Sequence, residues 1–115
     1  MKRIALLFLL LVGFPVFGGT NSVERFTVTA YCPCAKCCGK WSGGPTASGR
    51  MPVQGVTVAA PRSIKFGTWL NIEGVGKRRV DDRLATKFDN RIDVYFNSHA
   101  EAKKFGKRQL KVKKL

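Results

Sequence analysis

The sequence predicts an all-β fold, a compact barrel of six short strands with one or two short helices. Segments of alternating apolar and polar residues recur along the chain, and they are rich in β-branched and aromatic residues. Glycine and proline separate one segment from the next. The strands are expected at residues 23–31, 56–60, 69–73, 77–81, 91–96 and 110–115. Six short strands in a chain of 115 residues favour a closed barrel.

Residues 1–18 are expected to be a secretory signal peptide. Lys2 and Arg3 precede an apolar run over residues 4–16, and Gly18 and Gly19 mark the expected cleavage positions. The apolar run is shorter than the roughly 20 residues that a helix needs to span a bilayer, and an uncleaved N-terminal anchor is the alternative. In either case we expect residues 23–115 to form one barrel domain that is secreted, periplasmic or associated with the cell envelope.

The first half of this domain has two expected strands around a long loop. Residues 23–31 alternate, so that Arg25, Thr27 and Thr29 fall on one face and Phe26, Val28 and Ala30 on the other. Residues 39–55 hold five glycines and two prolines and are expected to be a loop. Residues 56–60 are β-branched or small, and Pro61 ends this strand.

The second half continues with a hairpin, a strand and a helix. Residues 69–73 and 77–81 flank a tight turn at Gly74-Val75-Gly76, and residues 91–96 are β-branched and aromatic. Ser98 and Glu101 fit a capping box for a helix of about two turns that ends at Gly106. Alternation in the last residues predicts the closing strand.

The charge of the chain is strongly positive. It contains 21 lysines and arginines and 7 carboxylates, a formal charge of +14. Loss of Lys2 and Arg3 with the leader would lower this charge by two, to +12. A charge of this sign favours polyanionic partners. For an exported monomer these are an anionic cell-wall polymer or a membrane surface, and nucleic acid is not expected.

Three of the seven carboxylates stand out because each ends, or lies within, an expected strand rich in β-branched residues, where carboxylates are depleted. They are Asp81, Asp82 and Asp93. Alternation places Asp93 on the same face as Arg91 and Tyr95. The pattern alone leaves two interpretations open, a surface charge or an ionisable group in a groove.

The cysteines form one cluster, Cys32, Cys34, Cys37 and Cys38, and the chain has no other. Four thiols at this spacing suit two structural disulfides or a tetrahedral Cys₄ zinc site. Export favours the disulfides. The single histidine, His99, falls in the first turn of the expected helix and is interpreted as a surface or packing residue.

Several segments resemble the three-aspartate (3D) domain of exported bacterial proteins. The resemblance covers nearly all of residues 23–115, and its most specific parts are the cysteine cluster and the motif Arg91-Ile92-Asp93-Val94. The matching segments are residues 27–39, 45–49, 58–61, 66–68, 90–95 and 98–106.

The resemblance implies a six-stranded double-psi β-barrel related to the catalytic domain of membrane-bound lytic transglycosylase A and to stationary-phase muralytic proteins. In that family three aspartates line a groove. The third corresponds to Asp93, the presumed acid/base, and the second to Asp82. The first corresponds to Ala60, so one carboxylate is absent. Residues 83–85 also depart from the family's Thr-Gly-Gly.

The resemblance therefore implies an exported enzyme that cleaves the glycosyl bonds of peptidoglycan strands by lytic transglycosylation, without a cofactor. Asp93 would act as acid/base and Asp82 as its modulator, while Thr46, Tyr31 and Arg91 would bind substrate. Burial and a neighbouring carboxylate would raise the pKa of Asp93, and nearby arginines would lower it. The alternative is a non-catalytic wall-binding module whose site has decayed.

Overall fold

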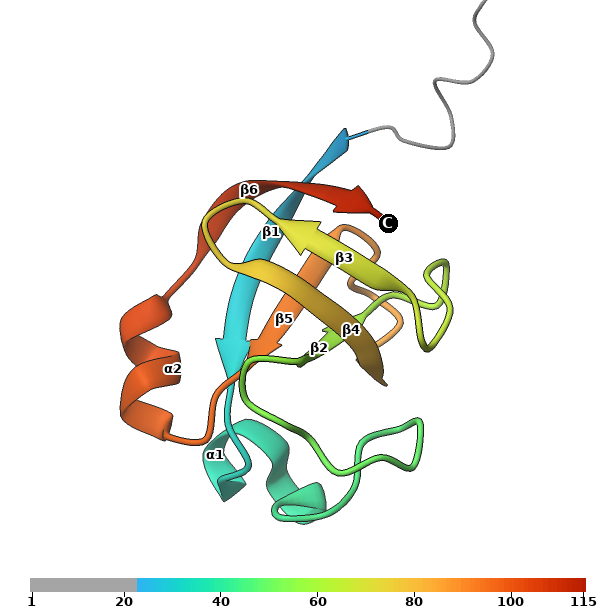
Figure 1. Cartoon of the computed structure of the whole chain (residues 1–115). Helices are drawn as coiled ribbons and strands as arrows, with labels where there is room; N and C mark the ends of the chain where they lie inside the picture. The colour runs from blue at the N-terminus through green and yellow to red at the C-terminus, as the bar shows by residue number, and fades with distance from the viewer. Residues whose placement is uncertain (1–22) are drawn as a thin grey trace, which may run out of the picture.

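The computed structural model describes residues 23–115 as a closed six-stranded barrel, so the all-β prediction is confirmed (Figure 1). The expected signal peptide lies outside the described residues. The strands are β1 (Val23–Tyr31), β2 (Thr57–Ala60), β3 (Trp69–Ile72), β4 (Gly76–Arg83), β5 (Arg91–Tyr95) and β6 (Arg108–Lys114). Around the barrel they follow the order β1-β5-β2-β4-β3-β6.

The barrel contains two parallel strand pairs, β1–β5 and β2–β4, and the other neighbours are antiparallel. Because parallel neighbours end at the same edge, β1 and β5 deliver the chain to one end of the barrel. In Figure 1 the short helix α1 (Ala35–Cys38) and the long loop that follows it lie at this end. The backbone N–H of Phe96 donates to the Tyr31 carbonyl at 2.8 Å and extends the β1–β5 pairing past the strand ends.

The barrel interior is filled by one apolar cluster to which every strand contributes. The predicted alternation of β1 is confirmed, because Phe26 and Val28 are buried and their neighbours are less so. The other buried members of the cluster are Val58, Ala60, Ile64, Leu70, Ile72, Val80, Ile92, Val94 and Val112.

A register shift between β2 and β4 interrupts the alternation at one point. Val58 pairs with Val80 and Ala59 pairs with Asp82, so Asp81 is an extra residue on β4. An unpaired residue of this kind re-aims the side chains that follow it. Val80 therefore packs in the core, and Asp82 stands beside Ala59 on the other face of the sheet.

The extra residue is itself held in place by a buried ion pair. Asp81 is 1% exposed and accepts from Arg79 through Nε at 2.7 Å and Nη2 at 3.0 Å. Thr57 of β2 donates its hydroxyl to the same carboxylate at 3.2 Å. Asp81 thus joins β2 to β4 at the shift, and each of its oxygens has a partner.

Several elements differ from the sequence prediction in kind or in bounds, and β6 begins two residues earlier than expected. The cysteine segment forms a helical turn, α1, and a 3₁₀ turn, Gly39–Trp41, follows it where only loop was expected. β4 runs two residues past the expected end at residue 81 because pairing with β2 resumes after the shift. The helix expected after the Ser98 cap is confirmed as α2 (His99–Phe105), with the Ser98 hydroxyl accepting from the Glu101 N–H at 3.2 Å.

Among residues 23–115, no helix has the length and apolar character needed to cross a membrane.

Asp81→Asn should destabilise the protein by about 2–4 kcal/mol, because it leaves the Arg79 guanidinium and Thr57 without a charged acceptor at a buried site. Urea unfolding measures the change. The matched control is Asp89→Asn at an exposed loop carboxylate, which should alter stability by less than about 0.5 kcal/mol. Equal changes in the free energy of unfolding for the two substitutions would contradict the structural role assigned to Asp81.

Candidate functional site

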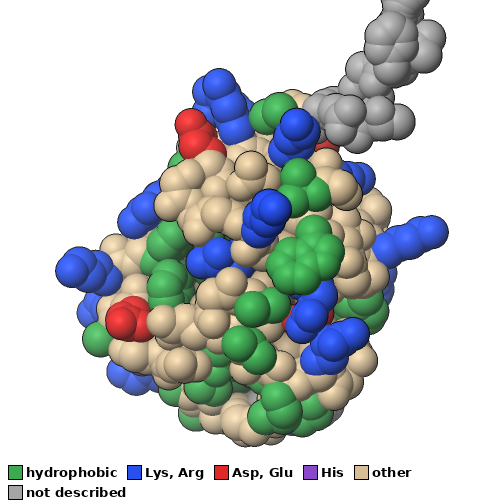
Figure 2. All heavy atoms as spheres, in the orientation of Figure 1, with side chains coloured by type: hydrophobic (Ala, Val, Ile, Leu, Met, Phe, Trp, Pro, Cys, Tyr) green, Lys and Arg blue, Asp and Glu red, His purple; other side chains and the backbone are tan. Residues whose placement is uncertain are grey.

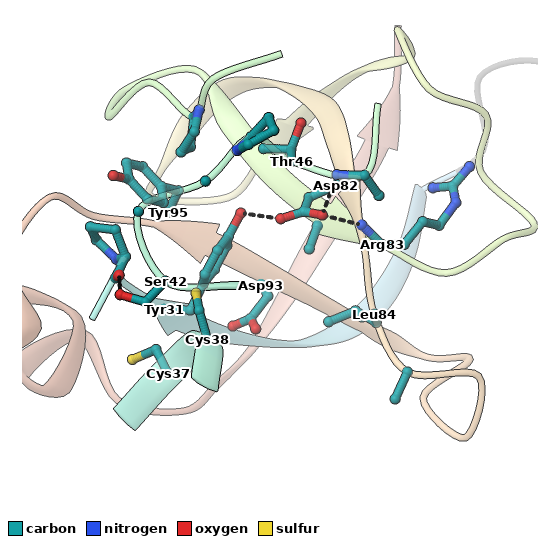
Figure 3. A pocket seen from close by; sticks show the side chains of 18 of the residues that line it. Tyr31, Cys37, Cys38, Ser42, Thr46, Asp82, Arg83, Leu84, Asp93 and Tyr95 are labelled. Carbon is teal, nitrogen blue, oxygen red and sulfur yellow. Dashed lines mark hydrogen bonds between the residues drawn. The ribbon is translucent and has the colours of Figure 1, made fainter. Parts of the chain in front are cut away.

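A cavity of about 880 Å³ opens where the ends of β1, β4 and β5 meet the segment that follows β1 (Figure 3). The two aspartates that the sequence singles out, Asp82 and Asp93, both line it. The remaining lining includes Tyr31, Tyr95, Cys37, Cys38, Thr46, Arg83, Leu84, Phe88 and Arg91.

Four side chains form a row across neighbouring strands along this cavity. Thr29 on β1 pairs with Asp93 on β5, Asp93 pairs with Ala59 on β2, and Ala59 pairs with Asp82 on β4. The two carboxylates are therefore two strand spacings apart, about 10 Å between their backbones, with only a methyl group between them. The sequence did not predict this row because strand order decides it.

Asp93 is half-buried and belongs to no ion pair within the described residues, where both recorded pairs use Asp81. Its Oδ1 accepts a hydrogen bond from the Thr29 hydroxyl at 2.7 Å. Burial raises the pKa of the Asp93 carboxyl above its ordinary value, and the charge of Asp82 adds to this. The hydrogen bond from Thr29 and the charge of Arg91 act in the opposite direction without cancelling the rise in pKa.

Asp82 accepts three hydrogen bonds. The Tyr31 hydroxyl donates to Oδ2 at 2.9 Å, and the backbone N–H groups of Ala47 and Arg83 each donate to Oδ1 at 2.9 Å. Figure 3 shows the Tyr31 hydroxyl pointing to the Asp82 carboxylate. Asp93 and Cys38 line the same cavity. These donors fix the orientation of Asp82, as suits a carboxylate that accepts only.

Tyr31 lines the cavity and does not pack into the barrel core. Its ring meets Tyr95 edge-on at a centroid distance of 5.4 Å. Burial and then the negative charge of Asp82 raise the pKa of the Tyr31 phenol, so it stays protonated and donates to Asp82.

Thr46 and Arg91 also line the cavity, but each side chain already has a contact within the protein. The Thr46 hydroxyl donates to the Arg50 carbonyl at 2.7 Å and closes the turn that presents Ala47 to Asp82. The Arg91 guanidinium stacks over Phe88, 4.2 Å from the ring centroid. Arg91 therefore brings positive charge to the cavity without pairing with Asp93.

Ala60, the position that the resemblance to the 3D domain assigns to its first aspartate, is fully buried in the core cluster. Its neighbour Ala59 lines the cavity instead. The Ala60 side chain therefore belongs to the core and does not line the cavity.

The cysteines lie close together as expected, but they are free thiols and no disulfide joins them. The sulfurs of Cys32, Cys34 and Cys37 gather around Nδ1 of His99, and these four atoms lie within 4.8 Å of one another. Cys38 stands apart and donates its thiol to the Cys32 carbonyl at 3.1 Å. His99, expected to be a surface or packing residue, stands in the first turn of α2 with its Nδ1 against these three sulfurs.

Positive charge is spread over the face of the barrel that Figure 2 shows. Figure 2 shows lysine and arginine side chains spread over the visible face with few carboxylates among them. Two arginines stack on aromatic rings at the cavity, Arg83 on Phe66 at 4.0 Å and Arg91 on Phe88 at 4.2 Å. Both guanidinium groups are held in place by these contacts.

No protein-family model matches the chain, and no curated protein matches it. The fold and the site together define a small six-stranded barrel with two carboxylates in an end cavity and a thiol–imidazole cluster beside that cavity.

Asp93→Asn should raise the melting temperature at neutral pH. Because the folded protein raises the pKa of Asp93, its contribution to stability is full below the ordinary value of 3.8 and is lost as the pH rises through the folded-state pKa. Asparagine cannot ionise, and its oxygen still accepts from Thr29. The gain over the wild type should be largest at pH 7 and should vanish below pH 3.8 in calorimetric scans.

The control is Asp89→Asn, which makes the same chemical change at an exposed carboxylate. It should show no such pH-dependent gain. A lower melting temperature of Asp93→Asn at pH 7 would contradict the sign of the pKa shift.

Proposed function

We propose that this protein is an exported enzyme that cleaves peptidoglycan glycan strands by lytic transglycosylation, with Asp93 as the single acid/base. The observation that carries the proposal is the state of Asp93. It is a half-buried carboxyl in a cavity, with a raised pKa and no arginine or lysine paired with it in the described chain. The resemblance to the 3D domain supplies the substrate class.

The first step needs an acid. Protonated Asp93 donates its proton to the glycosidic oxygen between N-acetylmuramic acid and the next sugar, and the bond from C1 to that oxygen breaks. The raised pKa makes this step feasible because it keeps a larger fraction of Asp93 protonated near working pH. Thr29 holds the carboxyl in one orientation through Oδ1, which leaves Oδ2 for the substrate.

The second step needs a base, and the same group can provide it. The C6 hydroxyl of the muramic acid attacks C1 and forms a 1,6-anhydro ring, and the Asp93 carboxylate takes the hydroxyl proton. Water is not consumed, and Asp93 ends protonated as it began. A hydrolase would instead need a second carboxyl at a defined distance to activate water or form a glycosyl-enzyme.

Asp82 supports this chemistry without exchanging a proton with the substrate. Its hydrogen bonds with Tyr31, Ala47 and Arg83 hold its charge in place, and that charge helps to raise the pKa of Asp93. It would also stabilise positive charge that develops at C1 in the transition state. Its partner Tyr31 lines the same cavity, where its ring could contact a sugar.

The positive surface favours retention on anionic cell-wall polymer or a membrane surface. The same surface is the observation that favours the alternative, a binding module that holds the wall without cleaving it. The two functions differ in their products, because only the enzyme creates anhydro ends.

Wild-type protein incubated with purified sacculi should release muropeptides with 1,6-anhydro ends, detected by mass spectrometry. Asp93→Asn should lower the rate of release at least 100-fold, because the acid/base is lost. Asp89→Asn keeps Asp93 and should release products at the wild-type rate. Unchanged release by Asp93→Asn would refute the assignment of the acid/base. If the wild type binds sacculi but releases no product, the protein is a binding module and not an enzyme.

Thr29→Val tests the electrostatic part of the proposal. The Thr29 hydroxyl lowers the pKa of Asp93, so its replacement by an isosteric methyl should raise that pKa further. The rate of anhydro product formation falls as the acid loses its proton, and this falling limb should therefore move to higher pH in Thr29→Val. A falling limb that stays in place or moves to lower pH would show that Asp93 does not control it.

A further inference from the structure

We propose that Cys32, Cys34, Cys37 and His99 bind one Zn²⁺ ion in a tetrahedral Cys₃His site. This site is separate from the chemistry proposed for Asp93, and it stands whether or not the protein cleaves glycan. It differs from the Cys₄ set that the sequence suggests, because the histidine replaces Cys38.

The distances among the four ligand atoms suit a small divalent ion. The His99 Nδ1 lies 3.4 Å from the sulfur of Cys32, 3.3 Å from that of Cys34 and 3.6 Å from that of Cys37. In a tetrahedral zinc site a sulfur and a nitrogen are about 3.6 Å apart, and two sulfurs about 3.8 Å. The sulfur of Cys32 lies 3.0 Å from Cys34 and 3.3 Å from Cys37, so a modest outward movement admits the ion.

The topology brings these residues together from distant parts of the chain. Tyr31 and Tyr95 are partners at the ends of the parallel strands β1 and β5. Cys32 follows β1 directly, and His99 opens α2 a few residues after β5. The same barrel end therefore holds both, although 67 positions separate them in sequence.

The local backbone presents the other two sulfurs. The N–H groups of Cys37 and Cys38 donate to the Cys34 carbonyl at 3.1 and 2.9 Å, which closes the single turn of α1. In such a turn the first and fourth residues face the same side. Cys34 and Cys37 thus meet Cys32 and His99 on one side, a spacing common to structural zinc sites.

The imidazole distinguishes metal from disulfides. Two disulfides would consume all four thiols and give the histidine nitrogen nothing to bind. Here three sulfurs converge on one nitrogen, while the fourth thiol, Cys38, is engaged with the Cys32 carbonyl. Zn²⁺ accepts a mixed sulfur and nitrogen set of this kind.

The site would also fix one wall of the cavity. Cys37 is a proposed ligand and lines the cavity, and its neighbour Cys38 lines it beside Asp93. Metal binding at Cys37 would hold α1 against the end of β1 and keep this wall in place. We therefore infer a structural ion, with all four coordination positions filled by protein and none left for substrate.

The full chain, purified under reducing conditions and reconstituted with Zn²⁺ alone, should contain one zinc per molecule by elemental analysis. X-ray absorption at the zinc edge should show three sulfur neighbours and one nitrogen. Removal of the ion with a chelator should lower the melting temperature by about 10 °C or more. These measurements need no variant, so a misfolded mutant cannot obscure them.

Variants then assign the ligands. His99→Ala and Cys34→Ser should each weaken zinc binding at least tenfold, measured by competition with a chromophoric chelator. Cys38→Ser is the matched control, since its hydroxyl can still donate to the Cys32 carbonyl, and it should bind zinc as the wild type does. Loss of zinc in Cys38→Ser with retention in His99→Ala would overturn the ligand set in favour of four cysteines. Failure of the reduced protein to take up zinc would overturn the metal site, and protein isolated without reductant that contains no free thiols would assign disulfides in its place.

Discussion

The buried ion pair of Asp81 and Arg79 is the interaction on which the site depends. It holds the extra residue of β4 against Thr57 of β2, and this fixes where pairing between the two strands resumes. A shift of one residue reverses the face of every side chain that follows. Without the extra residue, Asp82 would point into the apolar interior. The two adjacent aspartates thus have different roles, because Asp81 stabilises the pairing of β2 with β4 and Asp82 faces the cavity.

The electrostatics of the cavity depend on which arginines are occupied elsewhere. Arg79 is committed to Asp81, and Arg83 and Arg91 stack on phenylalanine rings. Of the three, Arg91 lowers the pKa of Asp93 through its charge, and none of them pairs with Asp93. Because they do not, burial sets the direction of its pKa shift. A carboxyl kept in this state costs stability, a cost that functional sites often carry.

Much of the fold could be predicted from the sequence because strand patterning, turn glycines and the Ser98 cap act locally. Asp82 and Asp93 could be singled out as carboxylates within strands. Which side chains meet across strands could not be predicted, because the order β1-β5-β2-β4-β3-β6 places residues together that are far apart in the chain. Thr29 beside Asp93 and His99 beside the cysteines are both results of the β1–β5 pairing, which local patterns do not specify.

Ala59 has a consequence for what the cavity can admit. Its methyl group is the whole side chain between the rows of β4 and β5, so the surface from one carboxylate to the other is continuous. A branched or longer residue at this position would protrude between the two carboxylates and divide the cavity into two smaller ones. The small size of Ala59 thus allows one ligand to extend past both carboxylates along the barrel end.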